Sequence, residues 1–391
     1  MLKLIQTDFL KAQKLIQRVS WPLRLSGFWP TDKSFISKLK YLFTMTYLIT
    51  HVIMEYCNFI SVFKNLDLMI LNFITISVQT ITIVRLAVLK YNKIVLSLIE
   101  TMEAFDGSNC KNHEEKIIYI YHSSRAIFFF KISFWFCFAS AINWYFTPLQ
   151  NFLFALIQNE TAILEIPYPI QTFFDISSME RIVFVYIYEV GVGWSGLCYA
   201  STFGVIIAMI TSLCTRLALL SHRIMNLQSK NTTLYASLFH DLVVEHMDII
   251  RTLNTFKAAY DLLFLYELLN ITLLISLILY YTLMTFDDAE MVDFISSAVF
   301  TFAATLSMYG YCLAGQWLES ESIKLGNTYW HCQWYDMPVS CKKNLIICMI
   351  FSQTPLHLTA GGFYNYSLMN FTSILKTAMA YVSMLRTVHQ R

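Results

Sequence analysis

The last apolar segment of the chain, TSILKTAMAYVSMLR at residues 372–386, carries small and hydroxyl side chains at helical spacing. On a helix of 3.6 residues per turn these side chains share one face. Such a face can pack closely against another helix, or it can line a water-filled path that the bulky Met384 and Val388 would constrict near its end. The residues of this face are Ser373, Thr377, Ala380, Met384, Thr387 and Val388.

The titratable residues do not form an arrangement typical of an enzyme or a metal centre. His51 and Glu55 are one helical turn apart, which would place two metal ligands on one face, but no second pair of donors accompanies them. The sequence contains neither an HExxH motif nor a nucleophile elbow. We therefore expect no catalytic residue, no metal and no cofactor.

Six charged side chains fall inside apolar stretches, where an unpaired charge is costly. Arg85, Lys131 and Glu267 lie near an expected membrane boundary, where they can extend to the interface or pair with an opposite charge. Structural pairing is also the simplest interpretation of Glu55 and Glu189, although either could face a water-filled cavity. The six are Glu55, Arg85, Lys131, Glu189, Glu267 and Lys376.

The composition identifies the broad class of protein. The chain has 391 residues, of which 56% are hydrophobic and only 14% are charged, and its mean hydropathy is +0.51. Because soluble domains rarely carry so little charge, we expect an integral membrane protein. The apolar runs recur without a linker rich in Pro, Gly or Ser, which favours a single domain over residues 1–391. A net charge of +2 with dispersed Lys and Arg residues argues against nucleic acid as a partner.

Seven apolar segments are long enough to cross a bilayer, which requires roughly 20 residues per helix. The expected fold class is therefore an all-α membrane protein with seven transmembrane helices. We place these spans at Tyr41–Phe63, Leu66–Leu89, Ile127–Pro148, Ile182–Ser212, Leu262–Thr285, Asp293–Gln316 and Asn365–Val388.

The connecting segments differ strongly in positive charge. About 21 Lys and Arg residues fall on the side that includes the N-terminus and about four on the other, and such residues collect on the cytoplasmic side of membrane proteins. We therefore expect a cytoplasmic N-terminus and an exofacial C-terminus. The sequon Asn159-Glu160-Thr161 then lies in an exofacial loop, so Asn159 is a candidate glycosylation site. None of the nine cysteines falls in an expected exofacial loop, which indicates free thiols.

Two further apolar patterns lie between the spans on the cytoplasmic side. Apolar residues recur at helical spacing from Leu234 to Tyr260 and continue into the fifth span, which predicts a long cytoplasmic helical extension with an apolar face that needs a partner. The stretch KKNLIICMIFSQTPL at residues 342–356 predicts a helix too short to span the membrane, closed by Pro355. Together they favour an intracellular helical layer suited to subunit assembly.

The C-terminal region resembles the signature of insect odorant receptors. The matching stretch is SQTPLHLTAGGFYNYSLMNFTSILKTAMAYVSMLR at residues 352–386, and the pair Trp334-Tyr335 and the PYP motif at residues 167–169 are also similar to that family. The chain departs from the family pattern at Gly362, where many relatives have lysine, and at Met369-Asn370, where acidic residues are more usual. Gustatory receptors share the architecture and a related last span, so they are the nearest alternative.

This resemblance implies a ligand-tuned subunit of an odorant-gated, nonselective cation channel. The subunit would assemble with a co-receptor subunit as a heterotetramer in the plasma membrane of olfactory sensory neurons, where it would contact membrane lipid and bind a small volatile organic ligand. The last spans would line the pore, and its constriction would correspond to Met384 with Thr387 and Val388 nearby. A gustatory-type homomeric channel and a nonconducting seven-helix receptor or carrier remain the alternatives.

The resemblance also divides the chain by role. Residues 1–40 would form a cytoplasmic N-terminal segment, residues 41–316 a ligand-binding bundle of six spans, and residues 317–391 a cytoplasmic helix and the pore-lining seventh span. The ligand would bind in the outer half of the bundle, between the second, third, fourth and sixth spans. The candidate ligand-binding residues are Phe73, Ser77, Cys137, Ser140, Trp144, Tyr188, Val192, Val299 and Phe302.

Overall fold

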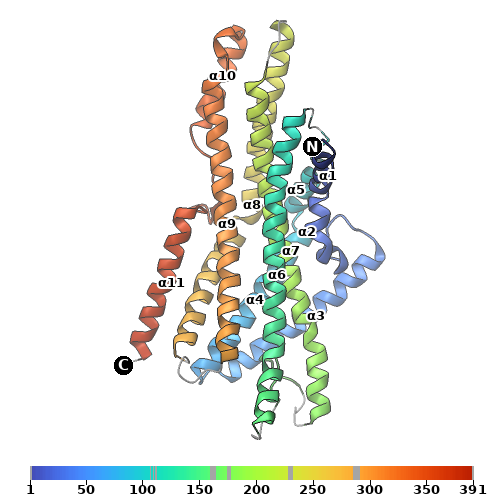
Figure 1. Ribbon diagram of the computed structural model, residues 1–391, viewed down its shortest axis with the longest axis vertical. Coiled ribbons are helices and arrows are strands. Elements are labelled where there is room, and N and C mark those ends of the chain that lie inside the picture. The colour runs from blue at the N-terminus through green and yellow to red at the C-terminus, as the bar shows by residue number, and fades with distance from the viewer. Residues whose placement is uncertain are drawn as a thin grey trace.

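The computed structural model describes residues 2–105, 107–108, 110, 112–158, 164–173, 178–227, 232–284 and 291–389. Helices make up nearly all of this part of the chain, and the longest run side by side along one axis of the molecule (Figure 1). The C-terminal end of α11 (Leu368–His389) points away from the end of the molecule that carries α10 (Val339–Ser352).

Seven long helices cover the seven predicted spans. Within the described residues, five of them are long and apolar enough to cross a membrane, namely α4, α6, α7, α8 and α9. The other two are α3 and α11, and α3 exposes large apolar side chains such as Phe35, Leu42 and Phe43 on its surface. The seven are α3 (Phe35–Ser61), α4 (Leu66–Tyr91), α6 (His113–Ile157), α7 (Met179–Met225), α8 (Thr232–Met284), α9 (Met291–His331) and α11.

Four of these helices are much longer than a membrane is thick. Helices α6 to α9 contain 41 to 53 residues, which at about 1.5 Å per residue corresponds to roughly 60–80 Å. Because the hydrocarbon core is only about 30 Å thick, they must project beyond it. The predicted cytoplasmic extension of the fifth span is therefore present as the first half of α8.

The apolar face of this extension is covered within the same chain. Leu242, Ile249, Leu253 and Phe256 are all buried. Helix α8 packs here against α7, α9, α10 and the short helix α5 (Lys93–Ala104). The apolar face that was expected to need a partner is thus covered mainly by other helices of this chain rather than by a second subunit. Helix α10 corresponds to the predicted short helix. Unlike the face of α8, its apolar residues Ile346, Ile347, Ile350 and Phe351 are exposed.

Helix α7 forms the centre of the molecule. It packs against α6, α9, α4 and the N-terminal helix α2 (Leu15–Leu25), which follows α1 (Leu2–Gln13). Its small residues allow this close packing: Ala200 and Ala208 are fully buried, and a Cβ added to Gly204 would lie 2.5 Å from the Phe130 ring. The same four-residue repeat begins at Gly196, but there an added Cβ would meet no atom within 4 Å.

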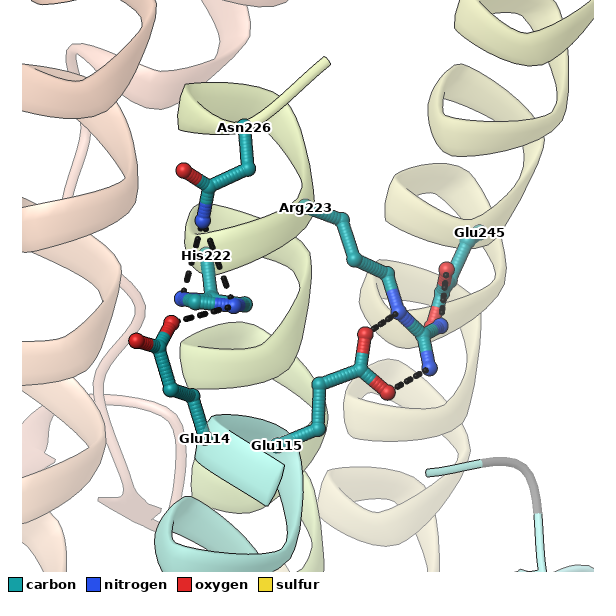
Figure 2. Close-up of polar contacts among 6 residues, drawn as sticks. All are labelled: Glu114, Glu115, His222, Arg223, Asn226 and Glu245. Atoms are coloured by element: carbon teal, nitrogen blue, oxygen red, sulfur yellow. Dashed lines mark hydrogen bonds and ion pairs between the residues drawn. The ribbon is translucent and has the colours of Figure 1, made fainter. Parts of the chain in front are cut away.

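An ionic cluster joins α6, α7 and α8 where they extend together (Figure 2). Arg223 of α7 donates to both carboxylate oxygens of Glu115 on α6, at 3.0 and 3.2 Å, and to Glu245 on α8 at 3.2 Å. The adjacent residue of α7, His222, lies 3.4 Å from Glu114, which precedes Glu115 on α6. One guanidinium group therefore bridges the carboxylates of two neighbouring helices.

A short hairpin connects α10 to α11. Strands β1 (Thr359–Ala360) and β2 (Tyr364–Asn365) pair antiparallel, with Thr359 opposite Asn365. Gly361 and Gly362 in the turn have φ angles of +61° and +75°, a region that side-chain-bearing residues rarely adopt. The glycine at 362, which departs from the family pattern, thus suits the turn in which it lies. This hairpin was not predicted from the sequence.

Candidate ligand-binding site

A cavity of about 130 Å³ lies between α4, α6, α7, α8 and α9. Most of its wall is apolar, and the lining residues include the large side chains of Trp144, Phe300 and Leu274. Tyr168, from the segment between α6 and α7 that holds the PYP motif, also lines it. A mostly apolar space with a few polar groups is typical of a site for a small organic ligand.

Four of the nine candidate ligand-binding residues line this cavity. They are Cys137, Ser140 and Trp144 on α6 and Val192 on α7. The first three are spaced by three and four residues, so they share one face of α6, and this face lines the cavity. Their contact with a ligand stays a prediction.

The other five candidates lie outside the cavity wall. Phe73 packs on the Phe59 ring and Phe302 on the Phe136 ring. Ser77, Tyr188 and Val299 also lie outside the cavity wall. Other residues of α4 and α9 line the cavity in their place. These are Ile74, Thr75, Val78, Gln79 and Ile81 on α4, and Phe300, Ala303, Ala304 and Ser307 on α9. Both helices are apolar over most of their surface, so the sequence does not indicate which face points inward.

One wall of the cavity comes from a helix that was not among the predicted ligand-binding spans. Helix α8, the fifth span, contributes Glu267, Asn270, Ile271 and Leu274. Glu267 was noted as a charge in an apolar stretch, and this was the available signal, because charges at membrane depth commonly face a cavity or a partner.

Glu267 in the cavity wall belongs to a buried ion pair. The Nε of Arg85 on α4 donates to Oε1 of Glu267, and both side chains are only 1% exposed. The Arg85 guanidinium also lies 4.1 Å from the centre of the Tyr199 ring and donates to the Tyr311 hydroxyl. Of the two alternatives that the sequence left for Arg85 and Glu267, extension to the interface or pairing, the structure shows pairing. Since a lone buried charge is costly, each partner depends on the other.

Contacts continue from this ion pair to the segment that begins α11. The Tyr311 ring lies 5.9 Å from the Tyr366 ring, and the Tyr366 hydroxyl donates to the Phe264 carbonyl at 3.0 Å. Tyr366 lies between strand β2 and α11, and a Cβ added to Gly315 of α9 would be 2.2 Å from its carbonyl oxygen. One packed chain of residues therefore joins the cavity to the start of α11.

The small and hydroxyl face of α11 points away from the rest of the chain. Ser373, Thr377, Ala380, Met384 and Thr387 are all exposed. The opposite face buries Ile374, Ala378 and Val382, and α11 packs against α8 and α9. The stripe is thus not used for packing within this chain. The side chain of Val388 and the whole of Asn159 lie outside the described residues, so their predicted roles stay predictions.

The other charges in the outer part of the bundle are only partly paired, since both Glu55 oxygens and Glu189 Oε1 are buried without a hydrogen-bond partner. His51 Nε2 lies 3.5 Å from Glu55 Oε1, and Glu189 Oε2 accepts a hydrogen bond from the Tyr168 backbone at 3.3 Å. Among the described residues, no group of three His, Cys, Asp or Glu side chains is placed to hold a metal ion. The nine cysteines are free thiols, as expected.

Replacing Gly196 with alanine is expected to reduce the cavity without disturbing the fold. The added methyl meets no atom within 4 Å and projects where Gly196 lines the cavity. Ligands that fill the space should lose about threefold to tenfold in apparent affinity, since a methyl-sized overlap costs about 1 kcal/mol, while smaller ligands keep theirs. Dose–response curves for a homologous series measure this, and equal loss across the series would contradict it.

A bundle of membrane-spanning helices around a mostly apolar cavity defines a polytopic helical membrane protein with room for a small organic ligand. The chain belongs to the 7tm Odorant receptor family, whose model matches residues 65–379. The resemblance inferred from residues 352–386 is thereby confirmed.

Among curated proteins, the chain is 26% identical over 246 residues to Odorant receptor 13a of Drosophila melanogaster, covering 57% of this chain and 58% of that protein. It is 21% identical over 241 residues to Odorant receptor 9a of the same species, covering 61% and 60%. The match thus spans somewhat less than two thirds of these relatives.

The fold is similar to that of the insect olfactory receptor OR5 from Machilis hrabei. The TM-score is 0.83 at 16% sequence identity, and the match covers 97% of this chain and 100% of that one. The same receptor in complex with eugenol matches equally well. This likeness confirms the seven-helix membrane fold that the sequence predicted.

Proposed function

We propose that this odorant receptor is the ligand-binding subunit of an odorant-gated, nonselective cation channel, working with a co-receptor subunit in the plasma membrane of olfactory sensory neurons. The observation that carries the proposal is the packed connection between the cavity and α11. Glu267 lines the cavity and pairs with Arg85, and Tyr311 and Tyr366 continue from this pair to the segment that precedes α11.

Gating requires that the ligand bind the open arrangement more tightly than the closed one. A volatile in the cavity contacts α4, α6, α7, α8 and α9 together, so its binding energy depends on how these helices are spaced. A change in their spacing would reach α11 through Tyr366 and relax the constriction that we assign to Met384, Thr387 and Val388. Membrane lipid would surround the remaining outer surface.

Assembly with other subunits is supported by two exposed surfaces. The stripe of α11 from Ser373 to Thr387 faces outward, which suits a pore shared by several subunits around one axis. The apolar residues Ile346, Ile347, Ile350 and Phe351 of α10 are also exposed, although α10 is too short to span a membrane. Contiguous exposed apolar side chains commonly mark a protein–protein contact.

Whole-cell current is the direct test of this proposal. Cells would express the chain with and without an insect odorant co-receptor, and a broad panel of volatiles that includes eugenol would be applied. A current that needs both chains, reverses near zero and appears for a narrow set of volatiles is the expected result. Current from this chain alone would favour a homomeric, gustatory-type channel, and silence with both chains shown at the surface would favour a nonconducting receptor.

Two substitutions should separate ligand binding from ion conduction. Trp144→Ala removes a ring that lines the cavity beside Phe300, and should raise half-maximal ligand concentrations about tenfold while leaving ion selectivity unchanged. Met384→Ala should increase resting leak or alter permeation while the ranking of ligands stays the same. Reversal potentials and dose–response curves measure both, and swapped outcomes would contradict the two assignments.

A further inference from the structure

Three hydroxyl donors of the cavity wall are already occupied. Thr75 donates to the Asn72 carbonyl at 2.9 Å, and Ser307 donates to the Ala303 carbonyl at 3.1 Å. Ser195 lies within hydrogen-bond distance of the Val192 carbonyl and of the Gln79 side-chain oxygen. These three hydroxyl groups therefore have no need of a ligand to accept their protons.

In contrast to these hydroxyl groups, Glu267 has a hydrogen-bond acceptor without a donor. Its Oε1 accepts from Arg85, whereas its buried Oε2 has no hydrogen-bond partner. The side chain is 1% exposed and the residue lines the cavity. A buried carboxylate oxygen without a donor is costly, and a ligand that brings a donor removes this cost.

The charge balance of the site selects the kind of donor. Arg85 already neutralises Glu267, so the pair carries no net negative charge for a cation to balance. An ammonium group would have to give up its water and enter as an excess charge, which is unfavourable in an apolar site. A neutral hydroxyl group supplies the missing donor without this penalty.

We propose that Glu267 selects odorants that carry a hydroxyl group, namely small alcohols and phenols that donate to its Oε2 from within the cavity. This inference rests on the proposed ligand-binding function. The cavity volume of about 130 Å³ is close to that of a cavity known to hold one benzene ring. The ligand is therefore a single-ring or short-chain alcohol, with its hydroxyl at Glu267 and its apolar part against Trp144 and Leu274.

Matched trios of volatiles test this in the wild-type receptor, expressed with its co-receptor. Each trio contains an alcohol, the aldehyde of the same skeleton, and the hydrocarbon in which a methyl group replaces the hydroxyl. Suitable trios are benzyl alcohol with benzaldehyde and ethylbenzene, and hexanol with hexanal and heptane. The alcohol should act at a half-maximal concentration at least about tenfold lower than the other two, since only it can donate to a charged acceptor.

Substitutions then assign the preference to Glu267. Glu267→Gln should reduce the advantage of the alcohol to about twofold, because an amide oxygen is a weaker acceptor than a carboxylate. Since this change leaves Arg85 without its ion partner, the double variant Arg85→Met with Glu267→Leu provides a second measurement in which both charges are removed together. Gly196→Ala is the matched control, because it narrows the same cavity without changing a polar group, so it should shift all three members of a trio alike.

Three outcomes would overturn the inference. The first is an aldehyde or hydrocarbon that acts as well as its alcohol. The second is a set of most potent volatiles that all lack a donor. The third is an alcohol advantage that stays at its wild-type size in both Glu267 variants. In each case the receptor still responds, so the proposed function stands, whereas silence to every volatile class would contradict the proposed function itself.

Discussion

Replacing Arg85 with alanine is expected to lower the free energy of unfolding by about 3–5 kcal/mol, which is typical when one partner of a buried ion pair is removed. The variant leaves the Glu267 carboxylate buried with neither a counter-charge nor its hydrogen bond. It also removes the contacts of the guanidinium with Tyr199 and Tyr311. Thermal melting of the detergent-solubilised protein, together with the fraction that reaches the cell surface, measures the effect.

Arg24→Ala is the matched control for this substitution. Arg24 lies 3.5 Å from Glu103, but the two side chains are 39% and 35% exposed. Exposed ion pairs contribute about 0–1 kcal/mol, so the control should melt close to wild type. Equal losses in the two variants would mean that burial does not decide the strength of the Arg85–Glu267 pair. The double variant Arg85→Met with Glu267→Leu should recover most of the stability, since buried pairs can be replaced by apolar side chains.

Replacing Gly315 with alanine is expected to abolish ligand-gated current. An added Cβ would lie 2.2 Å from the Tyr366 carbonyl oxygen and 3.1 Å from its carbonyl carbon. These are backbone atoms of the segment that begins α11, so no flexible side chain can move aside. Helix α9 and this segment must separate, which costs about 3 kcal/mol and breaks the connection between the cavity and the proposed pore.

Gly196→Ala supplies the control for Gly315→Ala. Both glycines lie inside long helices, so both substitutions bring the same gain in helix propensity, about 1 kcal/mol. Only Gly315 meets backbone atoms, whereas Gly196 faces open space. Surface expression and melting temperature should therefore fall for Gly315→Ala alone. A Gly315→Ala receptor that conducts normally would show that close contact with Tyr366 is not needed for gating.

Much of the fold was predictable from the sequence because each helix is specified by a run of consecutive residues. Apolar runs of membrane-spanning length placed all seven long helices, and the short helix before Pro355 was found in the same way. Cys137, Ser140 and Trp144, which were named from the sequence, all line the cavity, since their spacing of three and four residues places them on one face of α6. The outward stripe of α11 carries an equally clear pattern, which the burial of Ile374 and Val382 on its other side bears out.

The site itself was decided by the tertiary structure. On α4 and α9, apolar residues occur on all sides of the helix, so the sequence does not show which face points inward. The predicted residues Ser77 and Phe302 are each one position away from a residue that lines the cavity. Arg85 and Glu267 are 182 positions apart and Tyr311 is farther along still. No local sequence pattern predicts that these side chains are in contact, because their contact depends on how α4, α8 and α9 pack around α7. The sequence by itself determined that this is a seven-helix odorant receptor, since membrane length and the C-terminal signature are local properties. Only packing decided which side chains face the cavity and how the cavity reaches α11.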